Sequence, residues 1–174
     1  ARAGEPASIR QALAQLEARI RGGLGFAKTP ARFGAFPTDP YSHTPRHAGA
    51  QQPGMTGQVK EEILTRFGEL GVEVEAGLVR FRPTLLERGE FLAEPGAYRC
   101  YDLQGRETTI DVMAGSLAFS FCQVPVIYER TREEAWIRVT RKDGSSTDRS
   151  GDQLDAAESA ALFDRSGTVV RIEV

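Results

Sequence analysis

The sequence predicts an α+β fold that is mainly β: two N-terminal helices and a long ordered loop, followed by an antiparallel β-sandwich. Three observations lead to this prediction. Apolar residues recur at helical spacing in residues 5–21 and 55–70, no period survives from 26 to 54, and short alternating runs between turn residues fill 72–174. We therefore expect a helical segment with its loop at 1–71 and a sandwich domain with one late helix at 72–174.

The first helix is predicted from Glu5 to Arg21. Its apolar residues are spaced by four, three and four positions, and they are Ile9, Leu13, Leu16 and Ile20. Glycines at 22, 23 and 25 stop the helix. Because an apolar stripe needs a surface to cover it, this helix is expected to pack against a partner.

The loop from Phe26 to Gly54 is longer than most connections inside a compact domain, and such loops are usually functional or disordered. Order is the favoured alternative, because aromatic residues can anchor the segment and prolines reduce the entropy that ordering removes. The second helix is expected to begin near Met55, where Thr56 can cap it, and to end before Gly71.

The rest of the chain is predicted to alternate between short strands and turns. The expected strands are 72–75, 78–82, 98–103, 106–112, 117–122, 124–128, 135–141, 145–149 and 169–174, with a helix at 154–165. Asp143-Gly144 is the strongest hairpin signal. Alternation predicts that one set of side chains faces the core: Leu117, Phe119, Phe121, Ile137, Val139, Val170 and Ile172.

Composition narrows the function classes. The net charge of −2 comes from 22 basic and 24 acidic residues mixed along the chain, which disfavours a nucleic-acid partner. The sequence lacks a run of about 18 apolar residues, so no membrane partner is expected. The phosphate-loop pattern GxxxxGK[ST] is also absent, and we expect no cofactor. The missing signal-peptide pattern favours the cytoplasm, unless the chain is a fragment.

Cys100 and Cys122 are the only cysteines, without the spacing of a zinc site. Small buried thiols are the favoured interpretation, although both lie in strand-like runs that could be neighbours. A bridge between them stays an open alternative.

The densest polar group is Asp39, Tyr41, His43 and His47 in the long loop. Imidazole and carboxylate groups suit acid and base chemistry. Pro45 interrupts the histidine pair, so a helical metal-ligand geometry is disfavoured and no metal site is expected. The alternative is that both imidazoles hydrogen-bond the loop backbone.

Two neighbouring amides, Gln51 and Gln52, precede the second helix. Amides donate and accept at once, which suits sugar hydroxyls, but the same property lets them brace a loop. Aromatic residues of the strand region offer a stacking surface for sugar rings, although aromatics at alternate strand positions more often form the core. They are Phe119, Phe121, Tyr128 and Trp136.

Three stretches of the sequence carry a resemblance to known proteins: FPTDPYSHTPRHAGAQQPGMTGQVKEEILTRFGELGVEV, LAFSFCQVPVIY and the ending SGTVVRIEV. Through them the sequence resembles the C-terminal part of large bacterial glycoside-hydrolase-like proteins. In those chains an (α/α) toroid precedes a β-sandwich. The resemblance implies that Asp39, Tyr41, His43, His47, Gln51 and Gln52 line or brace a saccharide cleft. Only two amphipathic helices precede the strands here, however, so an independent catalytic site is in doubt.

Two functional hypotheses from different classes remain, with a third beside them. In the first, the chain is the C-terminal, mainly β portion of a carbohydrate-active bacterial protein with little catalysis alone, and its partners are a saccharide and the rest of a larger chain. In the second, it is a non-enzymatic interaction or assembly module that binds a second copy or another protein. The third is a small hydrolase that uses Asp39 with His43.

Overall fold

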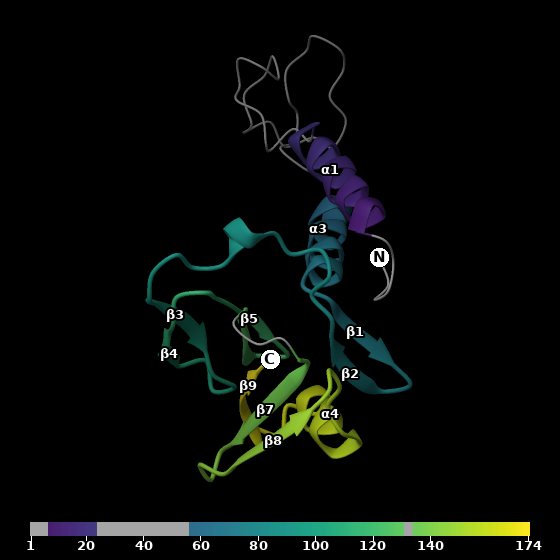
Figure 1. Ribbon diagram of the computed structural model, residues 1–174. Helices are drawn as coiled ribbons and strands as arrows, with labels where there is room; N and C mark the ends of the chain where they lie inside the picture. Colours follow the sequence, from purple (N-terminus) through teal and green to yellow (C-terminus); the bar gives the residue numbers. More distant parts are fainter. Residues whose placement is uncertain (1–6, 24–55, 131–133) are drawn as a thin grey trace. The chain divides into compact units, whose positions relative to one another are not determined.

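The computed structural model describes residues 7–23, 56–130 and 134–174, and three α-helices and nine strands lie within them. The chain divides into two compact units, Ala1–Leu70 and Gly71–Val174. Figure 1 shows their elements coloured along the sequence. The predicted class, α+β and mainly β, is confirmed.

The first unit holds two helices, α1 (Ala7–Gly23) and α3 (Thr56–Glu69), each within two residues of its predicted bounds. Their apolar side chains are exposed by 47% at Ile9, 41% at Leu13, 51% at Leu16, 52% at Ile63 and 70% at Leu64. These five apolar side chains are therefore exposed, whereas Phe67 of α3 is half-buried. None of the described helices combines the length and apolarity that crossing a membrane requires.

The predicted long loop, residues 26–54, falls mostly on 24–55, which lies outside the described residues. Its ordered path stays a prediction.

Two hairpins form small sheets of their own in the second unit. β1 (Val72–Glu75) pairs with β2 (Leu78–Phe81), and β3 (Gly96–Tyr101) pairs with β4 (Glu107–Val112), both antiparallel. The first turn is Ala76-Gly77, with φ of 50° and 79°. Two successive residues of positive φ match the twist of a two-residue hairpin, so the turn that the predicted strands 72–75 and 78–82 imply is confirmed. A short 3₁₀ turn, η2 (Arg88–Glu90), lies between the hairpins.

The largest sheet has five strands in the order β5-β6-β9-β7-β8. Their bounds are Ser116–Phe121, Val124–Glu129, Val169–Glu173, Trp136–Arg141 and Ser146–Ser150 in that order. The β6–β9 pair is parallel and the other pairs are antiparallel, so the sheet is mixed. The described strands are thus divided among three sheets, and the antiparallel sandwich stays a prediction.

Most of the side chains predicted to face the core do so. Leu117, Ile137, Val139 and Ile172 are buried, and Phe119 and Phe121 are half-buried. Val170 is an exception, because it is 39% exposed whereas Val169 is 3% exposed. The pairing of β9 with β7 shifts register between Thr140 and Arg141, and this irregularity reverses the alternation at Val170.

Helix α4 (Ala156–Phe163) contributes to the core between β8 and β9. Leu154, before the helix, and Leu162, within it, are completely buried. The buried Ser159 hydroxyl accepts a hydrogen bond from the backbone N–H of Val79 at 3.1 Å, which links α4 to β2. The helix therefore joins the first hairpin to the large sheet.

Candidate functional site

The site predicted from the sequence lies outside the described residues. Its six members are Asp39, Tyr41, His43, His47, Gln51 and Gln52, all within 24–55. Their convergence on a saccharide cleft stays a prediction. The two cysteines are described, and both are free thiols, with Cys100 buried and Cys122 half-buried.

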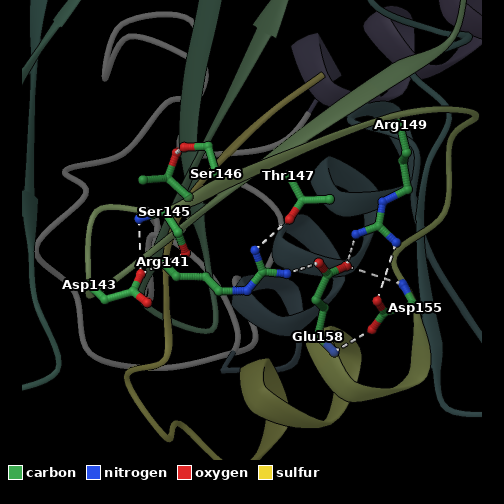
Figure 2. Close-up of polar contacts among 9 residues, drawn as sticks. Arg141, Asp143, Ser145, Ser146, Thr147, Arg149, Asp155 and Glu158 are labelled. Atoms are coloured by element: carbon green, nitrogen blue, oxygen red, sulfur yellow. Dashed lines mark hydrogen bonds and ion pairs between the residues drawn. The ribbon is translucent and has the colours of Figure 1, made fainter.

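One polar cluster joins helix α4 to the large sheet, as Figure 2 shows. Arg141, at the end of β7, donates from Nη2 to Glu158 Oε1 at 2.9 Å, and Arg149 of β8 donates to the other carboxylate oxygen. Arg141 Nη1 also donates to Thr147 Oγ1 at 2.6 Å. The Glu158 side chain is only 4% exposed. A buried carboxylate needs such partners, because an unpaired interior charge costs several kcal/mol.

The same carboxylate takes part in the N-terminal cap of α4. Asp155 Oδ1 accepts from the Glu158 N–H at 2.8 Å, and Glu158 Oε2 accepts from the Asp155 N–H at 3.3 Å. The Glu158 N–H and, less strongly, the nearby Arg149 lower the pKa of Asp155. Both Glu158 oxygens already accept hydrogen bonds within the protein. We therefore interpret this cluster as one that stabilises the position of α4 and not as a ligand site.

A cleft of about 540 Å³ opens where β6 ends and β7 begins, and its volume suits a small-molecule site. Much of its wall is aromatic. Tyr128 lies at one side, in edge contact with Phe81 at a centroid distance of 6.3 Å and with Phe119 at 5.3 Å. Burial raises the pKa of Tyr128 far above its ordinary value, so its hydroxyl stays protonated.

Two further aromatic rings line the cleft, and each lies in contact with the guanidinium group of an arginine. The Arg130 guanidinium lies 6.0 Å from the centroid of Phe91, and the Arg138 guanidinium lies 5.1 Å from that of Trp136. Both distances fall in the range of cation–π attraction. This attraction restricts the conformational freedom of each ring and of the guanidinium group that lies over it. Trp136 is half-buried, so part of the indole is accessible.

The cleft also has charged walls, formed by Arg88, Arg130, Glu134 and Asp152 among others. Asp152 accepts from Arg82, and this hydrogen bond is the main reason that the pKa of Arg82 is raised. Of the other charged side chains in the cleft, Arg88, Arg130 and Glu134 have no ion-pair partner among the described residues. They are therefore available to hydrogen-bond a polar ligand.

Sequence reasoning identified two of the cleft aromatics and missed the rest. Tyr128 and Trp136 were expected to serve either as core or as a stacking surface, and the structure divides them: Tyr128 is 2% exposed, whereas Trp136 is half-buried at the cleft. Phe91 and Arg130 were not singled out, because neither belongs to an alternating run. The only local feature in the sequence that could have indicated Phe91 was its position as an aromatic residue beside a turn.

Comparison with known proteins adds no relative. No family model matches this sequence, and none of the curated proteins gives a significant match.

Proposed function

We propose that this chain is a non-catalytic, saccharide-binding portion of a carbohydrate-active protein, and that the cleft at the end of β6 takes the sugar. The observation that supports this proposal is the combination of an accessible indole, Trp136, with unpaired charged groups in one concavity of about 540 Å³. The resemblance of the sequence to the C-terminal part of glycoside-hydrolase-like chains points the same way.

The chemistry of the walls suits a sugar ring. A pyranose has an apolar C–H face that packs on an aromatic ring and a rim of hydroxyl groups that donate and accept hydrogen bonds. In the cleft, Trp136 and Phe91 provide aromatic surface, Arg88 and Arg130 provide donors, and Glu134 provides an acceptor. The groups held by cation–π contacts lose less freedom on binding, which favours affinity.

The absence of catalysis is part of the proposal. Asp152, one of the carboxylates in the cleft, already accepts a hydrogen bond from Arg82 and so is less available to a substrate. The loop residues from Asp39 to Gln52 enter the proposal separately, as a second saccharide contact predicted from the sequence alone.

A screen of the intact 174-residue chain on an array of oligosaccharides tests the proposal. We expect binding to a subset of glycans, with the signal reduced at least about tenfold by Trp136→Ala and by Phe91→Ala. Arg99→Gln, an exposed change on β3 away from the cleft, serves as the control and should bind like the parent chain. Melting curves of all variants separate lost binding from lost folding. Failure to bind any glycan, or full binding by both aromatic variants, contradicts the proposal.

The second candidate, an assembly module, is favoured by the exposed apolar residues of α1 and α3. Leu16 is 51% exposed and Leu64 is 70% exposed. Water contact with several such side chains on one helix is unfavourable, and a partner that covers them gains about 25 cal/mol per Å² of apolar area buried. Light scattering coupled to size-exclusion chromatography should then show a mass above that of one chain, with Leu16→Ser and Leu64→Ser returning it to the monomer value. A monomer at all concentrations contradicts self-assembly.

A further inference from the structure

A second concavity, of about 350 Å³, lies where turns from four parts of the second unit meet. It is lined by the β3–β4 turn, the β5–β6 turn, Lys142 of the β7–β8 turn and the connection between α4 and β9. We call it the turn groove. It shares no lining residue with the cleft that contains Trp136, and an inference about it is independent of the proposed function.

Direct contacts hold these turns together. A Cβ atom on Gly167 would lie 3.4 Å from Cδ1 of Leu103, so the α4–β9 connection packs closely on the β3–β4 turn. The Lys142 N–H donates to the Thr168 carbonyl at 2.9 Å, which fixes the β7–β8 turn to the same connection. Three of the four segments that line the groove are therefore in contact with one another.

The charge of the turn groove is positive although the chain as a whole is negative. Its lining includes three basic residues, Arg106, Lys142 and Arg165, but one acidic residue, Asp102. Asp102 is fully occupied: Oδ2 accepts from Arg106 Nε at 2.8 Å, and Oδ1 accepts from the N–H groups of Gln104 and Arg106, each at 2.9 Å. Neither Lys142 nor Arg165 has an ion-pair partner among the described residues. Two cationic groups thus remain for a ligand.

The backbone conformation at Arg165 is a second observation that points to a functional role for this residue. The end of α4 forms a Schellman motif, in which the Arg165 N–H donates to Leu162 O and the Ser166 N–H donates to Ala161 O, both at 3.2 Å. Arg165 occupies the left-handed position of this motif, with a φ of 50°. Glycine is the usual residue there, because a side chain raises the energy of the left-handed region.

Gln123, which also lines the turn groove, shows the same feature. It has a φ of 64° in the two-residue turn between β5 and β6, and Cys122 beside it has a φ of 50°. Positive φ in a non-glycine residue is a reason to look for function at that position. Two polar side chains at this groove thus stand where the backbone alone would favour glycine.

We propose that the turn groove binds the phosphate group of a small molecule, with Lys142 and Arg165 as its cationic contacts and the Gln123 amide as a neutral donor. A phosphate carries a charge of about −2 near neutral pH and three acceptor oxygens, which complements two unpaired cations and neighbouring donors. The groove has a volume of only about 350 Å³, and basic and acidic residues are mixed along the chain, so a single phosphate is favoured over a nucleic-acid backbone as the ligand.

Amide NMR of the intact chain, titrated with inorganic phosphate and with glucose 6-phosphate at constant ionic strength, tests this proposal. Both ligands should shift the amides of Gln104, Arg106, Gln123 and Gly167 in a saturable manner, whereas glucose and acetate should not. If glucose 6-phosphate binds more tightly, the ligand is a phosphorylated small molecule, and equal affinities identify free phosphate. Either outcome supports a phosphate site.

Variants make the test specific. Arg165→Gly should weaken phosphate binding about tenfold while the melting temperature stays the same or rises, because glycine fits the left-handed position better. Lys142→Gln should weaken binding by a similar factor, and Arg99→Gln, exposed on β3 outside the groove, should leave it unchanged. The proposal is overturned if phosphate causes no saturable shifts, if acetate causes the same ones, or if both Arg165→Gly and Lys142→Gln bind phosphate like the parent chain.

Discussion

Arg141 of β7 donates to the Glu158 carboxylate of α4 at 2.9 Å, although 17 residues separate them in the chain. Arg149 of β8 reaches the other oxygen of the same carboxylate. One acidic side chain of a short helix therefore connects two strands, and it does so at a position that is 4% exposed. Helix α4 has only eight residues, too few to be stable by itself, so its order depends on such contacts and on its buried leucines.

Replacement of this carboxylate should be costly. We expect Glu158→Ala to lower the free energy of unfolding by about 3 kcal/mol, because it leaves two partly buried guanidinium groups without their shared partner. Urea denaturation followed by the fluorescence of Trp136, the only tryptophan, measures the change in the second unit. Glu94→Ala, at an exposed site, is the control and should change the free energy by less than about 0.5 kcal/mol. Equal stabilities for the two variants would contradict this role of the cluster.

The cap of α4 should make stability depend on pH under acidic conditions. The pKa of Asp155 is lowered in the folded chain below 3.8, chiefly by the N–H of Glu158. A lowered folded pKa contributes stability above the unfolded pKa, and this contribution is lost as the pH falls through the folded pKa. We expect Asp155→Asn, which can still cap but does not titrate, to flatten the loss of stability below about pH 4. Denaturation curves between pH 5 and 2 test this, and an unchanged pH dependence in the variant would refute it.

The junction before the first hairpin should tolerate no side chain. Gly71 has a φ of 68°, and a Cβ atom there would lie 1.9 Å from the carbonyl oxygen of Arg82. Gly77 has a φ of 79° but no atom within 4 Å of its Cβ position. Gly77→Ala should therefore cost about 1 kcal/mol for the left-handed backbone alone. Gly71→Ala should cost at least about 2 kcal/mol more in the same denaturation assay, and similar losses for the two would show that this close contact is not rigid.

The loop prediction can be tested without a structure of the loop. If Asp39 and His43 contact a saccharide, replacing either with Ala should weaken binding by more than it lowers the melting temperature. Ser42→Ala, in the same segment, is the control. A purely structural role predicts the opposite pattern, with lower stability and unchanged affinity, because the groups would then satisfy loop backbone. Calorimetry and a binding assay on the three variants distinguish the two roles.

The local features of the fold were predictable because each depends on a few adjacent residues. The turns Ala76-Gly77 and Asp143-Gly144 carry glycine where φ is positive, at 79° and 84°, and both hairpins were expected. The predicted strands 117–122 and 124–128 imply a break between them, but the turn at Cys122-Gln123 was not singled out, because neither residue is the glycine that such turns favour.

The long-range features were not predictable from local pattern. Periodicity cannot show that β6 and β9 pair in parallel or that the strands divide into three sheets. Val170 was wrongly placed in the core for the same reason, because the shift in register that exposes it depends on the neighbouring strand. The candidate cleft also depends on tertiary structure, since Phe91 and Trp136 come from distant segments that the fold brings to one concavity.

The most direct test of the proposed function uses Trp136 as its own reporter. As the only tryptophan, half-buried in the cleft, it dominates the intrinsic fluorescence of the chain. Titration with a panel of neutral oligosaccharides should produce a saturable change in its emission for at least one of them. Arg130→Gln should raise the Kd about tenfold, and Arg99→Gln should not change it. Emission that stays constant with every saccharide, or a Kd that Arg130→Gln leaves unaltered, would contradict a sugar site in this cleft.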